Sequence, residues 1–257
     1  MVPSPPSGPA PSALVQGLIQ DPARPARRLE KLLADLGPQI RRIQGDDLGV
    51  GEPLRCCPTG LAQIDRLLGG GIPRGRLSEI SGTLSSGRTS LALALLASTT
   101  RNGACTALVD RADGFDPRSA ETAGVDLDRV LWVRALGWRE ALRCTERLLE
   151  TEGFPLVLLD MPPSVEKAGR DARGSTCWLR LARSVAQTQV ALVVLSPQRL
   201  AGSHAEIVLE MQPTRARFSG TPALLEEFET RAVLVRHRSA PVGPTTSLRL
   251  RAHLSAA

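Results

Sequence analysis

The chain has 257 residues, 42% of them hydrophobic, which suits one α/β domain with a sizeable core and argues against two full domains. Its formal net charge is +6, but the only lysines are Lys31 and Lys167, and the arginines are spread along the chain. This distribution argues against a concentrated DNA-binding face, and genome composition also explains it. Aromatic residues make up 3% with no tyrosine, so few side chains could stack on single-stranded nucleic acid.

The cysteines and the N-terminus bear on where the protein works. Five cysteines are an odd number without C-x-x-C spacing, so we expect reduced structural thiols in a cytoplasmic protein. Residues 1–25 contain no basic region leading into an apolar core, and no stretch is long enough to span a membrane. The sequence therefore predicts a soluble protein without a membrane partner.

Composition divides the chain into three segments. Residues 1–24 are rich in proline and predict a disordered arm, residues 25–57 a helical segment and linker, and residues 58–257 the main domain. In the second segment Gly37-Pro38 should kink or split an amphipathic helix. The apolar residues at helical spacing are Leu29, Leu32, Leu33, Leu36, Ile40 and Ile43. They pack either on the chain's own core or on a neighbouring subunit, and the sequence favours neither.

Residues 82–89 read Gly-Thr-Leu-Ser-Ser-Gly-Arg-Thr and differ at one position from the phosphate-binding pattern G-x-x-x-x-G-K-[ST]. Arg88 stands where a lysine would reach the phosphates, and a branched guanidinium substitutes poorly for a compact ammonium. We expect catalysis to suffer more than nucleotide binding. A Gly-Ser loop without any nucleotide function is the alternative. The candidate nucleotide-binding residues are Gly82, Ser85, Ser86, Gly87, Arg88 and Thr89.

Strand and helix patterns alternate from Pro58 onward, as in a mainly parallel sheet flanked by helices. Apolar runs predict strands over residues 77–80, 106–110, 129–134, 155–160 and 190–196. Helical patterns cover residues 89–99, 139–152 and 176–187. Residues 206–253 alternate apolar and polar side chains, notably at 232–236 and 247–253, and predict antiparallel strands toward the C-terminus.

Several segments, taken in order, resemble the RecA ATPase core. Residues 58–82 run Pro-Thr-Gly-Leu-Ala-Gln-Ile-Asp-Arg-Leu-Leu-Gly-Gly-Gly-Ile-Pro-Arg-Gly-Arg-Leu-Ser-Glu-Ile-Ser-Gly into the loop. Residues 107–117 and 123–130 are similar to the next RecA segment, residues 156–160 to its Walker B strand, and residues 191–196 to the strand ending in its nucleotide sensor. The resemblance covers residues 27–212 and implies an α/β fold with a RecA-like P-loop core.

The chain departs from the RecA pattern at positions that take part in ATP hydrolysis in that family. That family has a water-activating glutamate two residues after the position of Asp110, and this chain has Ala112 there. Asp160 ends the Walker B strand, where it either orients Mg²⁺ or caps the following loop. The sensor, expected as Asn-Gln, reads Ser196-Pro197-Gln198.

The two DNA-binding loops of RecA recombinases are also altered. The second is nearly deleted, because only Arg-Leu-Ala-Gly-Ser-His follows Gln198 before the next strand pattern. Arg170 and Arg173 in the first loop could still give weak, salt-sensitive DNA binding through phosphate contacts.

A RecA-like core with these losses and a retained N-terminal helix is similar to the ImuA family of bacterial damage-tolerance cassettes. The resemblance implies a non-catalytic accessory protein of the SOS response to DNA damage, which supports error-prone translesion synthesis and mutagenesis. Its implied partners are RecA, contacted through the helix from Leu29 to Ile43, ImuB, and indirectly an error-prone polymerase, in the cytoplasm at the nucleoid. We expect no catalytic residue and no cofactor, with ATP and Mg²⁺ as a structural ligand the alternative.

The competing hypothesis is an enzyme, a DNA-stimulated ATPase of the RecA superfamily with a variant P-loop. Asp110 or Asp113 would then serve as the general base, and Asp113 lies one position beyond the expected glutamate. A base must first reach the attacking water, so geometry decides between the two hypotheses.

Overall fold

The computed structural model describes residues 56–111, 113–161, 175–221, 224–238 and 241–251. These residues belong to one compact unit of the chain, Leu54–Ala257. No helix among them is long and apolar enough to cross a lipid bilayer. The following candidate residues lie outside the described ranges: Leu29, Leu32, Leu33, Leu36, Ile40, Ile43, Ala112, Arg170 and Arg173.

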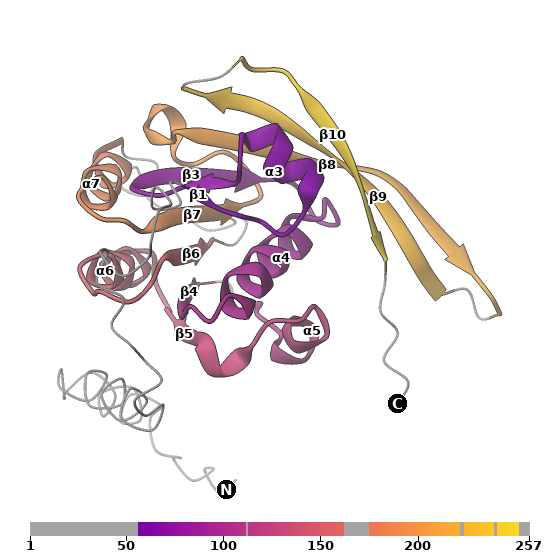
Figure 1. Ribbon diagram of the computed structural model, residues 1–257, viewed down its shortest axis with the longest axis horizontal. Coiled ribbons are helices and arrows are strands. Elements are labelled where there is room, and N and C mark those ends of the chain that lie inside the picture. The colour runs from indigo at the N-terminus through magenta and orange to yellow at the C-terminus, as the bar shows by residue number, and fades with distance from the viewer. Residues whose placement is uncertain (1–55, 112, 162–174, 222–223, 239–240, 252–257) are drawn as a thin grey trace, which may run out of the picture. The chain divides into compact units, whose positions relative to one another are not determined.

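An eight-stranded sheet organises the fold, in the strand order β10-β9-β8-β3-β7-β6-β4-β5 (Figure 1). Its parallel strands are β3 (Arg76–Ser81), β4 (Thr106–Asp110), β5 (Val130–Arg134), β6 (Leu156–Asp160) and β7 (Ala191–Ser196). Because the loops after parallel strands meet at one edge of the sheet, the ends of β3, β4, β6 and β7 lie together.

The C-terminal strands turn the sheet antiparallel, as the sequence predicted. β8 (Ile207–Ser219) pairs parallel with β3 over its first residues and, on its other side, antiparallel with β9 (Leu224–His237) along its whole length. β10 (Thr245–Arg251) adds an antiparallel edge to β9. The far half of the β8–β9 hairpin is exposed and extends beyond the helices (Figure 1).

Helices cover both faces of the parallel strands. α4 (Arg88–Arg101) and α5 (Pro117–Thr122) lie on one face, and α6 (Trp138–Leu149) and α7 (Ser175–Val185) on the other (Figure 1). The middle strands are consequently buried on both sides, and Leu156 through Leu159 of β6 have no exposed surface. This explains why the sequence shows continuous apolar runs here rather than alternation.

Element boundaries differ slightly from the predicted ones. The helix predicted over residues 139–152 ends at Leu149, and a turn through Gly153, with φ of +107°, leads into β6. The strand predicted over residues 129–134 begins at Val130, because Arg129 ends the short 3₁₀ helix η2 (Leu127–Arg129).

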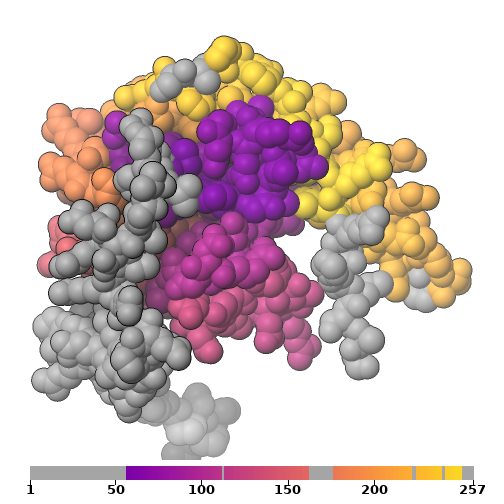
Figure 2. All heavy atoms as spheres, in the orientation of Figure 1, coloured from indigo at the N-terminus to yellow at the C-terminus, as the bar shows by residue number. Residues whose placement is uncertain are grey.

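A small element precedes the main sheet. β1 (Cys56–Cys57) pairs antiparallel with β2 (Ile72–Pro73), and α3 (Ala62–Leu68) connects them. The space-filling view shows this segment, in indigo and purple, against the yellow C-terminal strands (Figure 2). Thr59 anchors its start, because its backbone N–H and its hydroxyl both donate to Asp65 Oδ1, at 2.7 and 2.8 Å.

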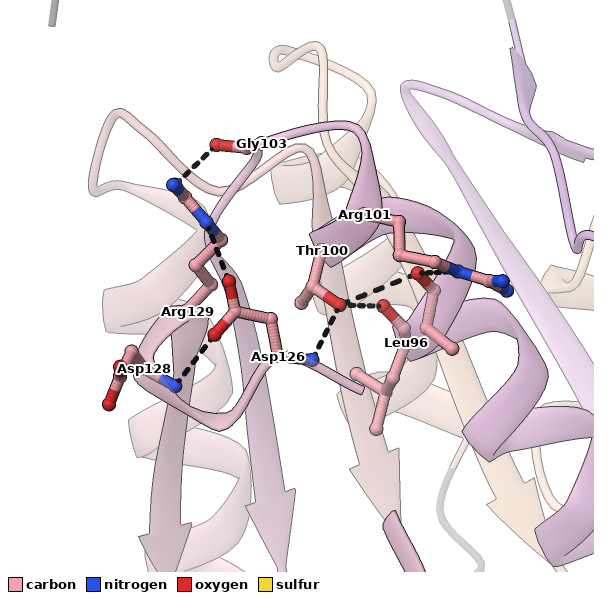
Figure 3. Close-up of polar contacts among 8 residues, drawn as sticks. Leu96, Thr100, Arg101, Gly103, Asp126, Asp128 and Arg129 are labelled. Atoms are coloured by element: carbon pink, nitrogen blue, oxygen red, sulfur yellow. Dashed lines mark hydrogen bonds and ion pairs between the residues drawn. The ribbon is translucent and has the colours of Figure 1, made fainter. Parts of the chain in front are cut away.

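The end of α4 that lies away from residues 82–89 is fixed by a polar network (Figure 3). Thr100 Oγ1 donates to the Leu96 carbonyl at 2.9 Å and accepts from Asp126 N at 3.1 Å. Arg129 donates from Nε to Asp126 at 3.0 Å and from Nη1 to the Gly103 carbonyl at 2.7 Å. The helix that begins at the candidate loop is therefore held at its other end by side chains of the η2 turn.

Candidate functional site

The candidate phosphate loop joins β3 to α4, as predicted. Gly87 caps α4 with φ of +84°, a left-handed conformation that favours glycine. A Cβ at Gly82 would lie 2.4 Å from Ser86 Oγ and 2.7 Å from the Met211 carbonyl oxygen, so a side chain there would force the loop apart. The loop leads into the N-terminus of α4, where unpaired backbone N–H groups attract anions.

Arg88 turns back onto the loop. Its Nη1 donates to the Gly82 carbonyl oxygen at 2.5 Å, which closes the loop between its first glycine and the start of α4. Burial lowers the pKa of Arg88, and the negative charge of Asp160 opposes that shift. The guanidinium therefore sits within the loop, next to the space where the pattern places phosphate.

Asp160 ends β6 beside this loop. The pKa of Asp160 is raised from 3.8 to about 6, chiefly by burial; the charge of Arg88 opposes this rise, and the charge of Asp110 adds to it. β6 pairs with β4 so that Asp160 and Asp110 are directly opposite. Two carboxylates and one guanidinium thus lie together at the carboxyl ends of the parallel strands, where open α/β sheets bind ligands.

The C-terminal strands press on the other side of the loop. Thr230, fully buried in β9, donates from Oγ1 to the Ser86 carbonyl at 2.5 Å and to the Gln212 carbonyl at 3.0 Å. A Cβ at Gly87 would lie 3.0 to 3.3 Å from atoms of Thr230, Leu250 and Phe228. Gly87 is therefore required by this packing as well as by its backbone conformation.

Comparison with known proteins agrees with this geometry. The RecA N-terminal domain family matches residues 45–169. Protein RecA of Clavibacter michiganensis is 30% identical over 248 residues, which cover 84% of this chain and 68% of that protein. The chain belongs to the RecA family. Protein RecA of Rhodopirellula baltica is 36% identical over 129 residues, 48% of this chain and 34% of that protein.

A solved structure supports the fold alone. The crystal structure of the RadB recombinase superposes with a TM-score of 0.59 at 24% sequence identity, over 75% of this chain and 95% of that one. This superposition shows that the chain has a RecA-like fold.

Neither aspartate considered as a general base of a RecA-family ATPase is free. Asp110 is buried, and its carboxylate accepts from Gly114 N at 3.2 Å, Phe115 N at 3.0 Å and Trp132 Nε1 at 3.3 Å. Asp113 is exposed and pairs with Arg134 at 2.5 Å, and this partner lowers the pKa of Asp113. Asp110 thus caps the loop after its own strand, the kind of role that was an alternative for Asp160.

The strand that ends at the sensor position is tied to β3. Glu79, fully buried in β3, accepts from Leu200 N at 2.5 Å, and its Oε1 also accepts from Ser196 Oγ at 3.3 Å. Burial raises the pKa of Glu79, although these donors oppose the shift. Gln198, the nearest glutamine to the family's sensor, is exposed, and its carbonyl accepts from Ser196 Oγ at 2.6 Å.

Sequence reasoning missed Glu79 and Thr230 as parts of the site. Glu79 stands three residues before Gly82, and a lone glutamate inside an apolar strand is the signal that could have indicated a buried hydrogen-bonding role. Thr230 lies in an alternating strand far along the chain, where nothing local distinguishes it. Its contact with the loop depends on the pairing of β9 with β8, which lies next to β3 in the sheet.

The backbone of the loop fits a bound phosphate, whereas its charged side chains fit one only in part. Gly82 and Gly87 give the loop its form, and Ser86 Oγ is buried without a hydrogen-bond partner. Thr89 and Asp160 are the candidate oxygen ligands of Mg²⁺. No cluster of three or more His, Cys, Asp or Glu side chains suited to a metal occurs among the described residues. A bound nucleotide would bring Mg²⁺ with its phosphates.

Proposed function

We propose that this RecA-family chain is a non-catalytic accessory protein in the response to DNA damage, with the role of the ImuA family in error-prone translesion synthesis. One observation supports it most directly: Arg88 replaces the phosphate lysine and donates to the Gly82 carbonyl inside the loop. The two aspartates considered as bases engage other partners. Membership in the RecA family supports the coarser statement, a protein related to DNA repair.

The proposed partners are RecA and ImuB, and through ImuB an error-prone polymerase. We propose that the apolar residues Leu29, Leu32, Leu33, Leu36, Ile40 and Ile43 contact RecA. An amphipathic helix can dock its apolar side into a hydrophobic groove on another subunit. Arg170 and Arg173 are proposed as weak DNA contacts through phosphates, which would make DNA binding fall steeply with salt. The chain would act in the cytoplasm, at the nucleoid.

Pull-down with purified RecA tests the partner proposal. We expect Leu32→Asp with Leu36→Asp to abolish RecA capture, because charge on the apolar side of the helix opposes its burial. Lys31→Asp is the matched control, because it makes the same change in net charge at a residue between the apolar positions. Unchanged RecA capture by the Leu32 and Leu36 variant would contradict the proposal.

A DNA-stimulated ATPase is the second candidate, and the retained loop backbone favours it. Gly82, Gly87 and Thr89 match the pattern, and Asp160 lies beside the loop. Combining Arg88→Lys with Ala112→Glu separates the two candidates in a phosphate-release assay. A non-catalytic protein that regains turnover should gain at least about 10²-fold, since a positioned general base alone contributes that much. An existing ATPase would gain little.

A further inference from the structure

A groove lies at the start of β3, at the opposite end of that strand from the phosphate loop. Its volume is about 290 Å³. β3 and α7 form its walls together with η3 (Gly202–His204) and the ends of β8 and β9. The groove is thus built from five elements that the fold brings together, and it is separate from the candidate nucleotide site.

Two arginines flank one acidic residue in the groove. Glu206 Oε2 lies 3.6 Å from Arg76 Nε and 3.9 Å from Arg238 Nε, and its side chain is only 14% exposed. Arg238 Nη2 also donates to the Ser203 carbonyl at 2.9 Å. Glu206 thereby holds two guanidinium groups that stay 53% exposed.

Arg183 adds a third positive charge from α7. It is exposed, and its side chain makes no hydrogen bond or ion pair with any residue that the structure describes. Its donors are therefore available to a ligand. The three arginines outnumber Glu206, so these four side chains give the groove an excess of positive charge. Glu206 orients two of the three guanidinium groups.

The floor of the groove is apolar. Leu179 and Ala182 of α7 and the buried Leu77 of β3 line this floor, and Ala186 lies at the rim, just past the end of α7. His204 is the one aromatic residue that lines the groove, and the lining includes no Phe or Trp, so the groove offers little surface on which nucleic-acid bases could stack. A basic rim around an apolar floor instead matches a chain segment that carries carboxylates beside an apolar side chain.

We propose that this groove binds an acidic peptide segment of a partner protein. Carboxylates of the segment pair with Arg183 and with the exposed side of Arg76, since a guanidinium donates two parallel hydrogen bonds to a carboxylate. One apolar side chain of the segment lies on Leu179 and Ala182, where it loses contact with water. The interaction needs no nucleotide and does not depend on the state of the phosphate loop.

Fluorescence anisotropy with the full-length protein tests this proposal. The probe is a fluorescein-labelled pentapeptide with leucine between two pairs of acidic residues, and a second probe carries serine in place of leucine. Arg183→Glu should weaken binding of the leucine peptide by about tenfold, because it turns an attraction into a repulsion. The serine peptide should bind several-fold more weakly than the leucine peptide.

Arg143→Glu on α6 is the matched control, because it reverses the same charge at an exposed helical position outside the groove. It should leave the dissociation constant within about twofold, the size expected of general screening. Ala186→Glu, at the exposed rim, should weaken binding independently of Arg183. Circular dichroism melting curves verify that each variant is folded.

Three results would overturn the proposal. One is that the leucine peptide does not bind the unmodified protein at millimolar concentration. Another is equal weakening by Arg183→Glu and Arg143→Glu, since that would reflect net charge alone. The third is a labelled oligothymidylate that binds more tightly than the peptide and shows the same dependence on Arg183, which would make the groove a nucleic-acid site.

Discussion

The parallel strands β3, β4, β6 and β7 and the antiparallel strands β8, β9 and β10 contribute differently to the candidate site. The parallel strands carry its charged groups, with Asp110 and Asp160 at their ends and Arg88 at the helix that follows β3. The antiparallel strands contribute Thr230, Phe228 and Leu250, which pack against the loop. The antiparallel strands therefore help to set the conformation of the loop, and the parallel strands supply the charged groups beside it.

The two parts also differ in burial. β6 and β7 are covered by helices on both faces, whereas the far half of the β8–β9 hairpin is exposed. Substitutions should therefore affect the unfolding free energy strongly in the parallel part and weakly at the hairpin tip. The loop, which touches both parts, should respond to changes in either.

The largest effect is expected in the core of the parallel part. Leu158→Ala removes a fully buried side chain of β6 and should lower the unfolding free energy by about 3 kcal/mol. Phe218→Ala, at the 59% exposed tip of the hairpin, is the contrasting variant and should cost less than about 0.5 kcal/mol. Urea denaturation measures both. Equal losses would show that the difference in burial does not govern stability.

A pH-dependent effect should follow from Asp160. Because the pKa of Asp160 is raised, the folded protein binds a proton at this carboxylate more tightly than the unfolded chain does between pH 3.8 and about pH 6. This contribution to the unfolding free energy is present at low pH and is lost as the pH rises through about 6, by on the order of 2 kcal/mol. Asp160→Asn should remove that part of the slope in urea denaturation from pH 4 to pH 7, measured in steps of about half a unit.

Asp113→Asn is the control for this titration. Arg134 lowers the pKa of the exposed Asp113, so its contribution has the opposite sign, and the variant should keep the slope that Asp160 causes. An unchanged pH profile in Asp160→Asn would contradict this prediction, because it would mean that the carboxylate at the end of β6 is better solvated than the structure indicates.

A smaller effect is expected where the antiparallel part meets the loop. Thr230→Val keeps the shape of the side chain but leaves the Ser86 carbonyl without its donor, at a cost of about 1 to 2 kcal/mol. Thr122→Val, at an exposed helix end, removes a comparable hydroxyl and should cost less than about 0.5 kcal/mol. Thermal unfolding followed by circular dichroism compares them. Similar shifts in Tm for both variants would contradict a structural role for the Thr230 contact.

Much of the parallel part could be predicted from the sequence, for a physical reason. Strands buried on both faces need continuous apolar runs, and each run was found close to its observed bounds, residues 106–110 without any difference. Gly82 and Gly87 also indicated the loop, because few residues other than glycine tolerate that backbone path. Short sequence patterns were therefore enough to predict the elements whose residue types depend on local backbone geometry or burial.

The antiparallel part and the side-chain contacts of the site could not be predicted in the same way. β8 and β9 appeared as short alternating runs, although they form one long hairpin with several register shifts. The contact of Thr230 with Ser86 spans 144 residues, and the hydrogen bond of Glu79 with Leu200 spans 121. Such contacts depend on strand order and register, which no single window of sequence contains. The direction of Arg88 is likewise a property of the folded loop.

We propose that this RecA-family chain does not hydrolyse ATP. Binding of a fluorescent ATP analogue and phosphate release by the purified full-length protein, with and without single-stranded DNA, test this proposal. We predict no turnover above background under either condition, and none from Arg88→Ala, which removes the guanidinium from the loop. Turnover that rises with DNA and is lost in Asp160→Asn would contradict the account and establish an ATPase.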